Sequence, residues 1–439
     1  MTTKPSQEEL TLNSLLKVYL ETHNKLDKNT NGELEVRFGT RQISKITKNT
    51  FDNVVQYLLA SNFKLTNQGQ HYLSIKAEDI RCEIYNLINI QNYCKTNSLP
   101  TEYPQAGYKF NNKTTYMINP STPARINFDQ FNFRVTYSIE NDIQPNTPEV
   151  QKIIQDWSSI NKFNRLICRF SFENPDFPVR VDMSIVREAK ATKNIRDTNI
   201  FKLNPKYEIE IEILNEKITD ESPDKLEAIL KKVSKYILSG LQGTNFPIPY
   251  SELNNIGDQY LQIINSSTTS KIISPSDFIG PSSITLQIPN IAPINTDSTI
   301  INVRTNYTVT DKADGDRKLL FINNKGKIFL ITTQASIEFT GAETKNTELF
   351  NSILDGEHIK HNKLNSFINL YAAFDIYFIN NKDVRTFEFT TSDKSSLPNK
   401  LRWNILDTTI KTLNPVETNT GKLSPIRIQI KQFYDVSPT

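Results

Sequence analysis

Two short stretches rich in glutamate decide the fold, Glu33-Leu34-Glu35-Val36-Arg37 and Glu208-Ile209-Glu210-Ile211-Glu212. Successive side chains of a β-strand point to opposite faces, so each stretch places its glutamates on one face and its aliphatic residues on the other. The aliphatic faces are expected to pack in a core. Either stretch alone is equally compatible with an ordinary strand that has one solvated face.

Other segments with the same two-residue period carry positive charge. Their shared polar faces are Arg134, Thr136, Ser138 and Glu140; Arg165, Arg169 and Ser171; Arg180, Asp182 and Ser184; and Lys109 and Lys113. If these strands curl with their polar faces inward, they form a closed antiparallel barrel with a charged interior. Carboxylates in that interior would hold Mg²⁺ or Mn²⁺, and arginine and lysine would bind phosphate oxygens.

Regions with helical spacing surround these strands. The sequence predicts helices near residues 6–20, over Thr50–Ser61, and from Ser222 to about Gly240, where apolar residues recur every three or four positions. Serine, proline and threonine concentrate between about residues 245 and 297, which predicts a domain boundary there. We therefore expect a first domain over 1–242, a linker over 243–271, and a second domain over 272–439.

The second domain contains Lys312-Ala313-Asp314-Gly315, followed by Asp316-Arg317. A KxDG tetrad occurs by chance, and on its own it favours a surface turn over a nucleotide-binding motif. Three further segments accompany it: Phe278 to Pro281; Ile353-Leu354-Asp355-Gly356-Glu357; and Phe374-Asp375 with Lys382-Asp383-Val384-Arg385. A lysine attacks phosphorus only as the free amine, so its pKa must be lowered, and Arg317 and a bound metal are candidates for that effect.

The glutamate strands, with the basic strands between them, resemble the metal-dependent RNA triphosphatases of the tunnel-barrel family, nearest to those that begin the mRNA-capping enzymes of large (giant) DNA viruses. The resemblance implies an α+β fold, with an antiparallel eight-stranded tunnel barrel and flanking helices. It implies that Glu33, Glu35 and Glu212 bind Mg²⁺ or Mn²⁺ and that Glu210 positions the attacking water. The implied triphosphate-binding residues are Arg37, Lys109, Arg134, Arg169 and Arg180, with Glu140, Asp182 and Glu208 in supporting roles.

The lysine motif and its companions resemble the covalent nucleotidyltransferases, which include mRNA guanylyltransferases and ligases. The resemblance implies that Lys312 forms a lysine–GMP phosphoramidate, Arg317 contacts the ribose, Phe374 stacks on the guanine, and Glu357 acts through a metal or orients the lysine. A triphosphatase barrel placed directly ahead favours capping over ligation, because the diphosphate end that it produces accepts GMP. No EGhV-like motif, KxK pair or lid domain follows Arg385. We therefore expect a partial α+β nucleotidyltransferase domain.

The sequence thus predicts an enzyme of mRNA 5′ capping that removes the γ-phosphate of 5′-triphosphate RNA and carries a truncated guanylyltransferase domain. Expected partners are the 5′ end of nascent mRNA, GTP, and a separate chain that supplies the missing guanylyltransferase and methyltransferase parts. The alternatives are a tunnel enzyme acting on free nucleoside triphosphates or polyphosphate, and a non-catalytic subunit that binds RNA ends.

Composition limits the class of protein. Lys+Arg 51 against Asp+Glu 48 gives a net charge of +3, so bulk charge does not indicate nucleic-acid binding. Three cysteines without CxxC spacing predict neither a disulfide framework nor a zinc site. No long apolar stretch predicts a membrane segment. The resemblance to capping enzymes of giant viruses implies a viral protein located in the host cytoplasm, at the virus factory, or in the virion.

Overall fold

The computed structural model describes residues 7–27, 29–40, 45–99, 107–218, 222–265, 272–294, 299–304, 307–390 and 400–435. The chain divides into two compact units, Met1–Gly243 and Thr244–Thr439. We call them the barrel unit and the C-terminal unit, and each is described by itself.

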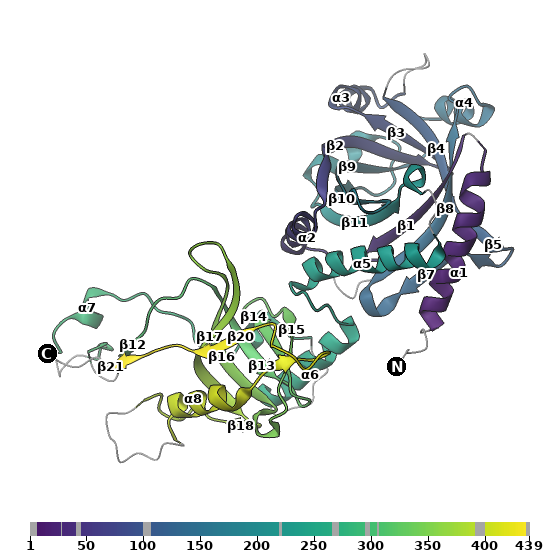
Figure 1. The fold of residues 1–439 in the computed structure, drawn as a ribbon. Coiled ribbons are helices and arrows are strands. Elements are labelled where there is room, and N and C mark those ends of the chain that lie inside the picture. The colour runs from purple at the N-terminus through teal and green to yellow at the C-terminus, as the bar shows by residue number, and fades with distance from the viewer. Residues whose placement is uncertain are drawn as a thin grey trace. The chain divides into compact units, whose positions relative to one another are not determined.

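The barrel unit is built on eight antiparallel strands that close on themselves (Figure 1). Their order around the barrel is β1 (Thr30–Phe38), β11 (Lys206–Ile213), β10 (Val179–Glu188), β9 (Lys162–Glu173), β2 (Lys64–Ala77), β3 (Ile80–Tyr85), β4 (Tyr108–Thr115) and β8 (Phe133–Ile143). Pairing of β8 with β1 completes the ring. Strand β7 (Arg125–Phe128) adds to the edge of β8, and β5 (Met117–Asn119) pairs with β6 (Thr122–Pro123). The predicted eight-stranded antiparallel barrel is confirmed.

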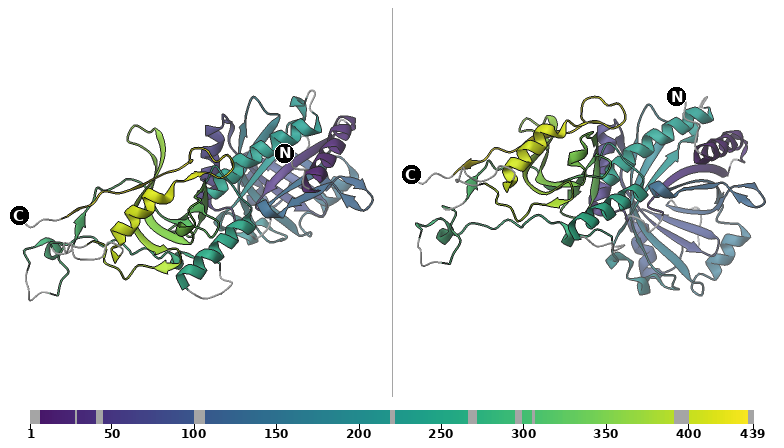
Figure 2. Two further views of the ribbon diagram at one scale, coloured as in Figure 1. Left: turned by 60° about the horizontal axis from the view of Figure 1, so that its bottom comes forward. Right: turned by 90° about the horizontal axis from the view of Figure 1, so that it is seen from below.

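The aliphatic faces of the glutamate strands point outward, into a core shared with three helices. Leu34 and Val36 of β1 and Ile209 and Ile211 of β11 are buried. They pack with apolar side chains of α1 (Gln7–Thr22), α2 (Lys48–Ala60) and α5 (Pro223–Gln242). Figures 1 and 2 both show α1 beside α5 on the outside of the barrel. Because the helices cover the aliphatic faces, the charged faces must point into the lumen.

Local sequence explains where α5 begins and ends. The Ser222 hydroxyl accepts a hydrogen bond from the Lys225 N–H, and Pro223 occupies the first turn, where its missing N–H costs nothing. The helix ends at Gly243, which has a φ of 67°, a left-handed conformation that glycine adopts without steric cost. The two shorter helices α3 (Leu87–Thr96) and α4 (Pro148–Gln155) are additions that the sequence analysis does not predict.

The C-terminal unit contains a mostly antiparallel sheet. Its strand order is β18 (Lys382–Asp383), β17 (Phe367–Ile379), β16 (Ser352–His361), β13 (Asp316–Ile322), β14 (Lys327–Thr332), β15 (Ile337–Glu343) and β19 (Val416–Glu417), and β20 (Arg427–Ile430) pairs in parallel with β17. Helix α8 (Arg402–Leu413) packs into one hydrophobic cluster of this sheet through Leu406 and Leu413. A separate pair of short strands, β12 (Thr308–Val309) and β21 (Tyr434–Asp435), and the short helix α7 (Ile288–Ile291) complete the unit.

The prediction of a linker over residues 243–271 is wrong for most of this stretch. Helix α6 (Tyr250–Asn265) lies there, and its Ile256, Tyr260 and Leu261 are buried in a cluster with β13 and β14. The Tyr260 hydroxyl donates a hydrogen bond of 2.7 Å to the carbonyl of Asp277. This stretch is therefore part of the C-terminal unit, and the boundary between units falls at Gly243.

None of the helices in the described parts of the chain combines the length and the apolar character that a membrane crossing requires.

Close packing of α5 on α2 provides a test of the barrel unit. A Cβ at Gly240 would lie 2.5 Å from Val54 Cα and 2.8 Å from Val54 N, and backbone atoms cannot move aside cheaply. We expect Gly240→Ala to lower the free energy of unfolding by about 1–3 kcal/mol, as overpacking does. Urea unfolding measures this loss. Replacement of the exposed Lys235 on the same helix by alanine should leave stability nearly unchanged, and an equal loss in both variants would contradict the assigned contact.

Candidate active site

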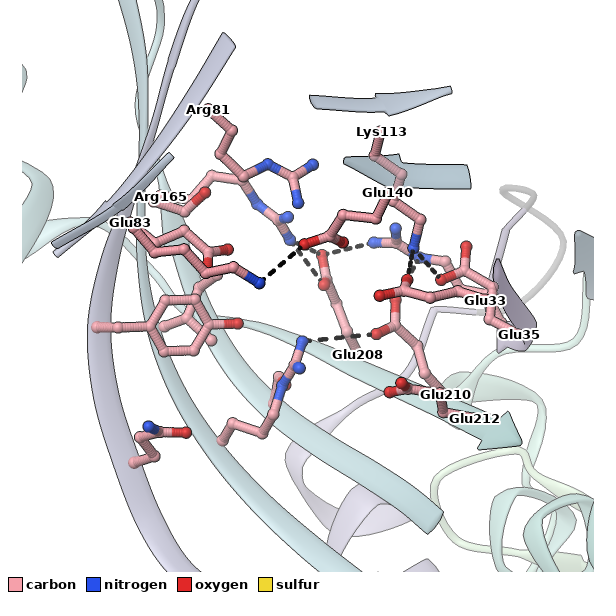
Figure 3. Close-up of a pocket in the computed structure, with 18 of the residues that line it drawn as sticks. Glu33, Glu35, Arg81, Glu83, Lys113, Glu140, Arg165, Glu208, Glu210 and Glu212 are labelled. Atoms are coloured by element: carbon pink, nitrogen blue, oxygen red, sulfur yellow. Dashed lines mark hydrogen bonds and ion pairs between the residues drawn. The ribbon is translucent and has the colours of Figure 1, made fainter. Parts of the chain in front are cut away.

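The inward faces of the eight strands enclose a cavity of about 300 Å³ (Figure 3). Its charged lining is balanced, with seven glutamates and seven cations. The glutamates are Glu33, Glu35, Glu83, Glu140, Glu208, Glu210 and Glu212, and the cations are Arg37, Arg81, Lys109, Lys113, Arg165, Arg169 and Arg180. Buried charges persist when they are paired, and six of the seven lining cations form ion pairs with acidic side chains of the barrel. The predicted mixed-charge lumen is present.

Lys113 joins the two glutamates of β1. Its ammonium lies 2.6 Å from an oxygen of Glu33 and 2.9 Å from an oxygen of Glu35. Burial alone would raise the pKa of Glu33, but the charge and hydrogen bond of Lys113 outweigh burial and lower it. Likewise, burial would lower the pKa of Lys113, but Glu35 and Glu33 raise it. The Lys113 ammonium therefore occupies a cation position between two carboxylates.

Glu212 lies directly across from Glu35 in the pairing of β1 with β11. It accepts a hydrogen bond of 2.5 Å from Arg180, which also binds Asp182 at 2.9 Å. Burial raises the pKa of Glu212 to about 7; Arg180 opposes the shift, and the negative charge of Glu33 adds to it. Glu212 thus carries an incompletely compensated carboxylate beside Glu35.

Glu208 and Glu210 share a strand face but differ in pairing. Glu208 lies 2.8 Å from Arg37 and accepts hydrogen bonds of 2.7 Å from Arg165 through both of its oxygens. Glu210 is 3.5 Å from Arg37 and 3.8 Å from Arg169. Glu208 therefore holds two arginines in place, whereas Glu210 makes only loose ion pairs.

Asp182, Glu140 and Lys109 hold other groups in place. Asp182 is 2% exposed, lies 3.3 Å from Arg169, and is not among the residues that line the cavity. Glu140 accepts a hydrogen bond of 2.8 Å from Asn111 and lies 3.4 Å from Lys109. Burial, together with the charge of Glu33, raises the pKa of Glu140 to about 7.

The sequence analysis places Arg134 among the triphosphate-binding residues, and the structure places it differently. It lies outside the set of residues that line the cavity, and its Nε donates a hydrogen bond of 2.8 Å to Asn127 on β7. The β7 strand adds to the edge of β8 there, so this end of β8 faces a neighbour that sequence periodicity does not reveal.

Sequence reasoning also misses several lining residues. It assigns Lys113 and Arg165 to polar strand faces but gives them no role, and it does not identify Arg81, Glu83 and Tyr85. Strand β3 does show the alternation, as Arg81-Cys82-Glu83-Ile84-Tyr85, and this pattern is the signal that could have identified it.

The lumen contains ligands that are suitable for a divalent cation. Glu33, Glu35 and Glu212 offer hard carboxylate oxygens, the ligands that Mg²⁺ and Mn²⁺ prefer. Within the described ranges, no three histidine, cysteine, aspartate or glutamate side chains are grouped as metal ligands. The cation between Glu33 and Glu35 in this structure is the Lys113 ammonium.

The lysine motif of the C-terminal unit leads into β13. Lys312 is exposed, and the Gly315 N–H donates a hydrogen bond of 3.0 Å to Glu357 on β16. Arg317 lies opposite Glu357 in the pairing of these strands. A Cβ at Gly315 would come within 2.7 Å of the His358 carbonyl oxygen, so glycine permits the close approach of the motif to β16.

Arg317 is the centre of the aromatic part of this site. Its guanidinium lies over the rings of Phe278 and Phe374, with centroid distances of 5.5 and 5.7 Å, and binds Asp355 at 2.5 and 3.1 Å. The ammonium of Lys431 lies 5.9 Å from the centroid of Phe374. The structure thus brings Arg317, Phe374 and the Phe278 segment together, and adds Lys431, for which the sequence indicates no role.

The chain is similar to several known proteins. Residues 263–439 match the family model described as "mRNA capping enzyme, catalytic domain". A capping-enzyme catalytic domain is present in the C-terminal region. The chain is also similar to a probable mRNA-capping enzyme of Acanthamoeba polyphaga mimivirus, with 28% identity over 231 residues, which cover 52% of this chain. The chain spans 17% of the length of that relative.

Among solved structures, the chain is similar to the S. pombe Pct1 RNA triphosphatase, with 11% identity and a TM-score of 0.30, covering 54% of this chain and 90% of the other. It is also similar to the PH1819 protein from Pyrococcus horikoshii OT3, with 14% identity and a TM-score of 0.24, covering 46% and 89% respectively.

The raised pKa of Glu140 predicts a dependence of stability on pH. A carboxyl group whose pKa is higher in the folded than in the unfolded chain binds more protons when folded. Its contribution to the free energy of unfolding therefore falls as the pH rises from about 4.5 to about 7. The Glu140→Gln side chain does not titrate. Over this range, the free energy of unfolding of the wild type should therefore fall by about 1–3 kcal/mol more than that of the variant.

Urea unfolding at pH 4.5, 6 and 7.5 tests this expectation. Glu21→Gln, on an exposed position of α1, is the control and should follow the wild-type pH profile. Parallel profiles for wild type and Glu140→Gln would contradict the assignment.

Proposed function

We propose that the barrel unit is a metal-dependent RNA 5′-triphosphatase and that the chain acts in mRNA capping. The observation that carries the proposal is the closed lumen, in which Glu33 and Glu35 face Glu212 among seven cations. A substrate with several adjacent negative charges is complementary to such a cation-rich channel, and the capping-domain match of residues 263–439 supports an RNA end as that substrate.

The proposed chemistry is hydrolysis of the bond between the β- and γ-phosphates, in which water attacks the γ-phosphorus and a diphosphate RNA end leaves. Arg37, Lys109, Arg169 and Arg180 would orient the triphosphate. Mg²⁺ or Mn²⁺, held by the Glu33, Glu35 and Glu212 carboxylates, would supply charge neutralisation to the transferred phosphoryl group.

Glu210 is the proposed residue for positioning the attacking water. Its closest described cations are 3.5 and 3.8 Å away, whereas Glu208 is bound at 2.7–2.8 Å. A carboxylate with loose ion pairs retains lone pairs that can accept a hydrogen bond from water. Glu208, Glu140 and Asp182 would instead hold arginine and lysine side chains in position.

For the C-terminal unit we propose covalent guanylyl transfer. The Lys312 amine would attack the α-phosphorus of GTP, pyrophosphate would leave, and the bound GMP would pass to the diphosphate RNA end. Arg317 would contact the ribose, Phe374 would stack on the guanine, and Glu357 would act through a metal. The contact of Gly315 with Glu357 supports this proposal, because it joins the lysine motif to the acidic strand.

The proposal also covers the origin and the location of the protein. The similarity to a mimivirus capping enzyme supports a viral origin, with action in the host cytoplasm or the virion.

Substitution of the metal-binding carboxylates tests the triphosphatase assignment. Glu33→Gln or Glu212→Gln should lower release of inorganic phosphate from triphosphate-ended RNA by at least about 100-fold with Mg²⁺ or Mn²⁺, because removal of a preorganised charged group commonly costs that much. Glu149→Gln on the exposed face of α4 should retain full activity. Undiminished release of inorganic phosphate by Glu33→Gln would contradict the triphosphatase assignment. Equal cleavage of RNA, ATP and tripolyphosphate would favour a general polyphosphatase, and no cleavage with retained binding would favour an RNA-end-binding subunit.

Guanylylation has a direct readout. Incubation with labelled GTP and Mg²⁺ should yield an acid-stable protein–GMP adduct that is lost completely in Lys312→Ala, because only this amine forms the phosphoramidate. Lys325→Ala, on an exposed turn of the same unit, should retain the label. If label persists in Lys312→Ala, the assigned nucleophile is wrong.

A further inference from the structure

Two β-bulges interrupt the pairing of β16 with β17 in the C-terminal unit. In the register of these two described strands, Phe374 and Tyr377 are extra residues on β17, because the residues that flank each of them pair with consecutive residues of β16. Such a residue changes the direction in which its side chain points. Both bulges lie at the Arg317 site: the Phe374 ring contacts the Arg317 guanidinium, and Tyr377 contacts Asp355, which binds Arg317.

Asp355 joins Tyr377 to Arg317 through a single oxygen atom. The Tyr377 hydroxyl donates a hydrogen bond of 2.6 Å to Oδ2 of Asp355, and the same oxygen accepts one of 2.5 Å from Nη2 of Arg317. Oδ1 accepts a hydrogen bond of 3.1 Å from Nε of Arg317. Burial and the charge of Asp355 both raise the pKa of Tyr377, so its hydroxyl stays protonated and donates. Tyr377 therefore orients the carboxylate that binds Arg317.

Arg317 keeps donors that the protein does not use. A guanidinium has five N–H bonds. Nε and Nη2 each donate one to Asp355, and Nη1 donates one to the carbonyl of Pro281 at 2.5 Å. Within the described ranges, one N–H bond on each terminal nitrogen is thus left over. The Arg317 side chain is 29% exposed, so a ligand can reach these two donors.

The space around the guanidinium is narrow. A Cβ at Gly280 would lie 2.5 Å from Nη2 of Arg317 and 3.0 Å from Oδ2 of Asp355. The rings of Phe278 and Phe374 lie against the same guanidinium, at 5.5 and 5.7 Å. With its surroundings fixed in this way, the direction of the two remaining N–H bonds depends on how the Asp355 carboxylate is held. A supporting hydrogen bond such as that of Tyr377 sets this kind of geometry.

We propose that Tyr377 is a positioning residue of the nucleotide site, which acts through Asp355 to aim the two remaining N–H bonds of Arg317 at the ribose hydroxyls. The adjacent 2′ and 3′ hydroxyl oxygens of a ribose can accept two hydrogen bonds from one planar guanidinium. The C-terminal unit thereby selects ribonucleotides over dideoxynucleotides. The proposal rests on the proposed guanylyl transfer, in which Arg317 contacts the ribose, and adds the residue that holds this contact in place.

Tyr377→Phe tests the proposal, because it removes only the hydroxyl. The readout is the ribose preference, defined as the rate of adduct formation from labelled GTP divided by the rate from labelled 2′,3′-dideoxyGTP, both at subsaturating concentration. Hydrogen bonds to a charged group are commonly worth roughly 10- to 100-fold, which is the ribose preference expected of wild type. Tyr377→Phe should lower it roughly 3- to 10-fold, the usual worth of one hydrogen bond. The rate with dideoxyGTP should change less than about twofold.

A double-mutant cycle tests whether Tyr377 acts through Asp355. Asp355→Asn should lower the ribose preference further than Tyr377→Phe does. Adding Tyr377→Phe to Asp355→Asn should then change the preference less than about twofold, because the link to Arg317 is already broken. Additive effects of the two substitutions would overturn the proposal.

Tyr371→Phe is the matched control. Its hydroxyl is also buried, but it bonds to the backbone of Lys318, Leu320 and Leu354 rather than to a side chain of the site. This variant should be less stable to urea and keep the ribose preference of wild type. An equal fall of the preference in Tyr371→Phe and Tyr377→Phe would trace the effect to lost sheet stability and overturn the proposal. An unchanged preference in Tyr377→Phe would overturn it as well.

Photolabelling separates this proposal from the proposed guanylyl transfer. 8-Azido-GTP labels a nucleotide site without reaction at phosphorus. GTP should compete for labelling of the C-terminal unit better than dideoxyGTP does, and Tyr377→Phe should reduce this difference. If competition follows this pattern but wild type forms no adduct, guanylyl transfer fails and the role of Tyr377 stands. If the adduct forms with a ribose preference that does not depend on Tyr377, guanylyl transfer stands and the positioning role is wrong.

Discussion

Charge pairing between the inward faces of the strands is the interaction on which the barrel depends. Fourteen charged side chains line one cavity of about 300 Å³, and an unpaired charge at such depth would cost several kcal/mol. Ion pairs offset most of this cost, because the acidic faces of β1 and β11 lie within reach of lysine on β4 and of arginine on β9 and β10, and Arg81 is the lining cation left without a carboxylate partner among the described residues. Arg180 is opposite Glu212, and Lys113 is opposite Glu140 while its ammonium binds Glu33 and Glu35.

The same pairing limits what the lumen can bind. An arginine or lysine that is already bound to a carboxylate has to exchange or share that partner before it can bind phosphate. Most of the positive charge in the lumen can therefore bind phosphate only when the carboxylates gain another partner. A divalent cation at Glu33, Glu35 and Glu212 would be such a partner, and burial, together with the charge of Glu33, raises the pKa of Glu212 there. Metal and triphosphate binding are therefore expected to support each other.

The C-terminal unit arranges its cations differently. Its cations lie against aromatic rings: Arg317 contacts Phe278 and Phe374, and Lys431 also lies over Phe374. An aromatic surface with a cation beside it can bind a base and a phosphate of the same nucleotide. This differs from the barrel lumen, where apolar lining is confined to a few residues such as Ile167 and the stacked Tyr72 and Tyr85.

The sequence by itself determined the strand faces and the lysine motif. A period of two assigns every second residue to one side, so periodicity alone places Glu33 with Glu35, and Glu208 with Glu210 and Glu212, on shared faces. The start of α5 is also determined by local sequence, because the Ser222 cap and the following Pro223 act within a single helical turn.

Only the tertiary structure decided which charges meet. Strand order and register place Lys113 between Glu33 and Glu35, put Arg134 outside the cavity, and leave Arg81 without a carboxylate partner among the described residues. Helix α6 carries apolar residues at helical spacing that the sequence analysis overlooked, and only the structure shows that Ile256, Tyr260 and Leu261 are buried against distant strands. These outcomes depend on contacts between residues far apart in the chain, and local periodicity carries no information about them.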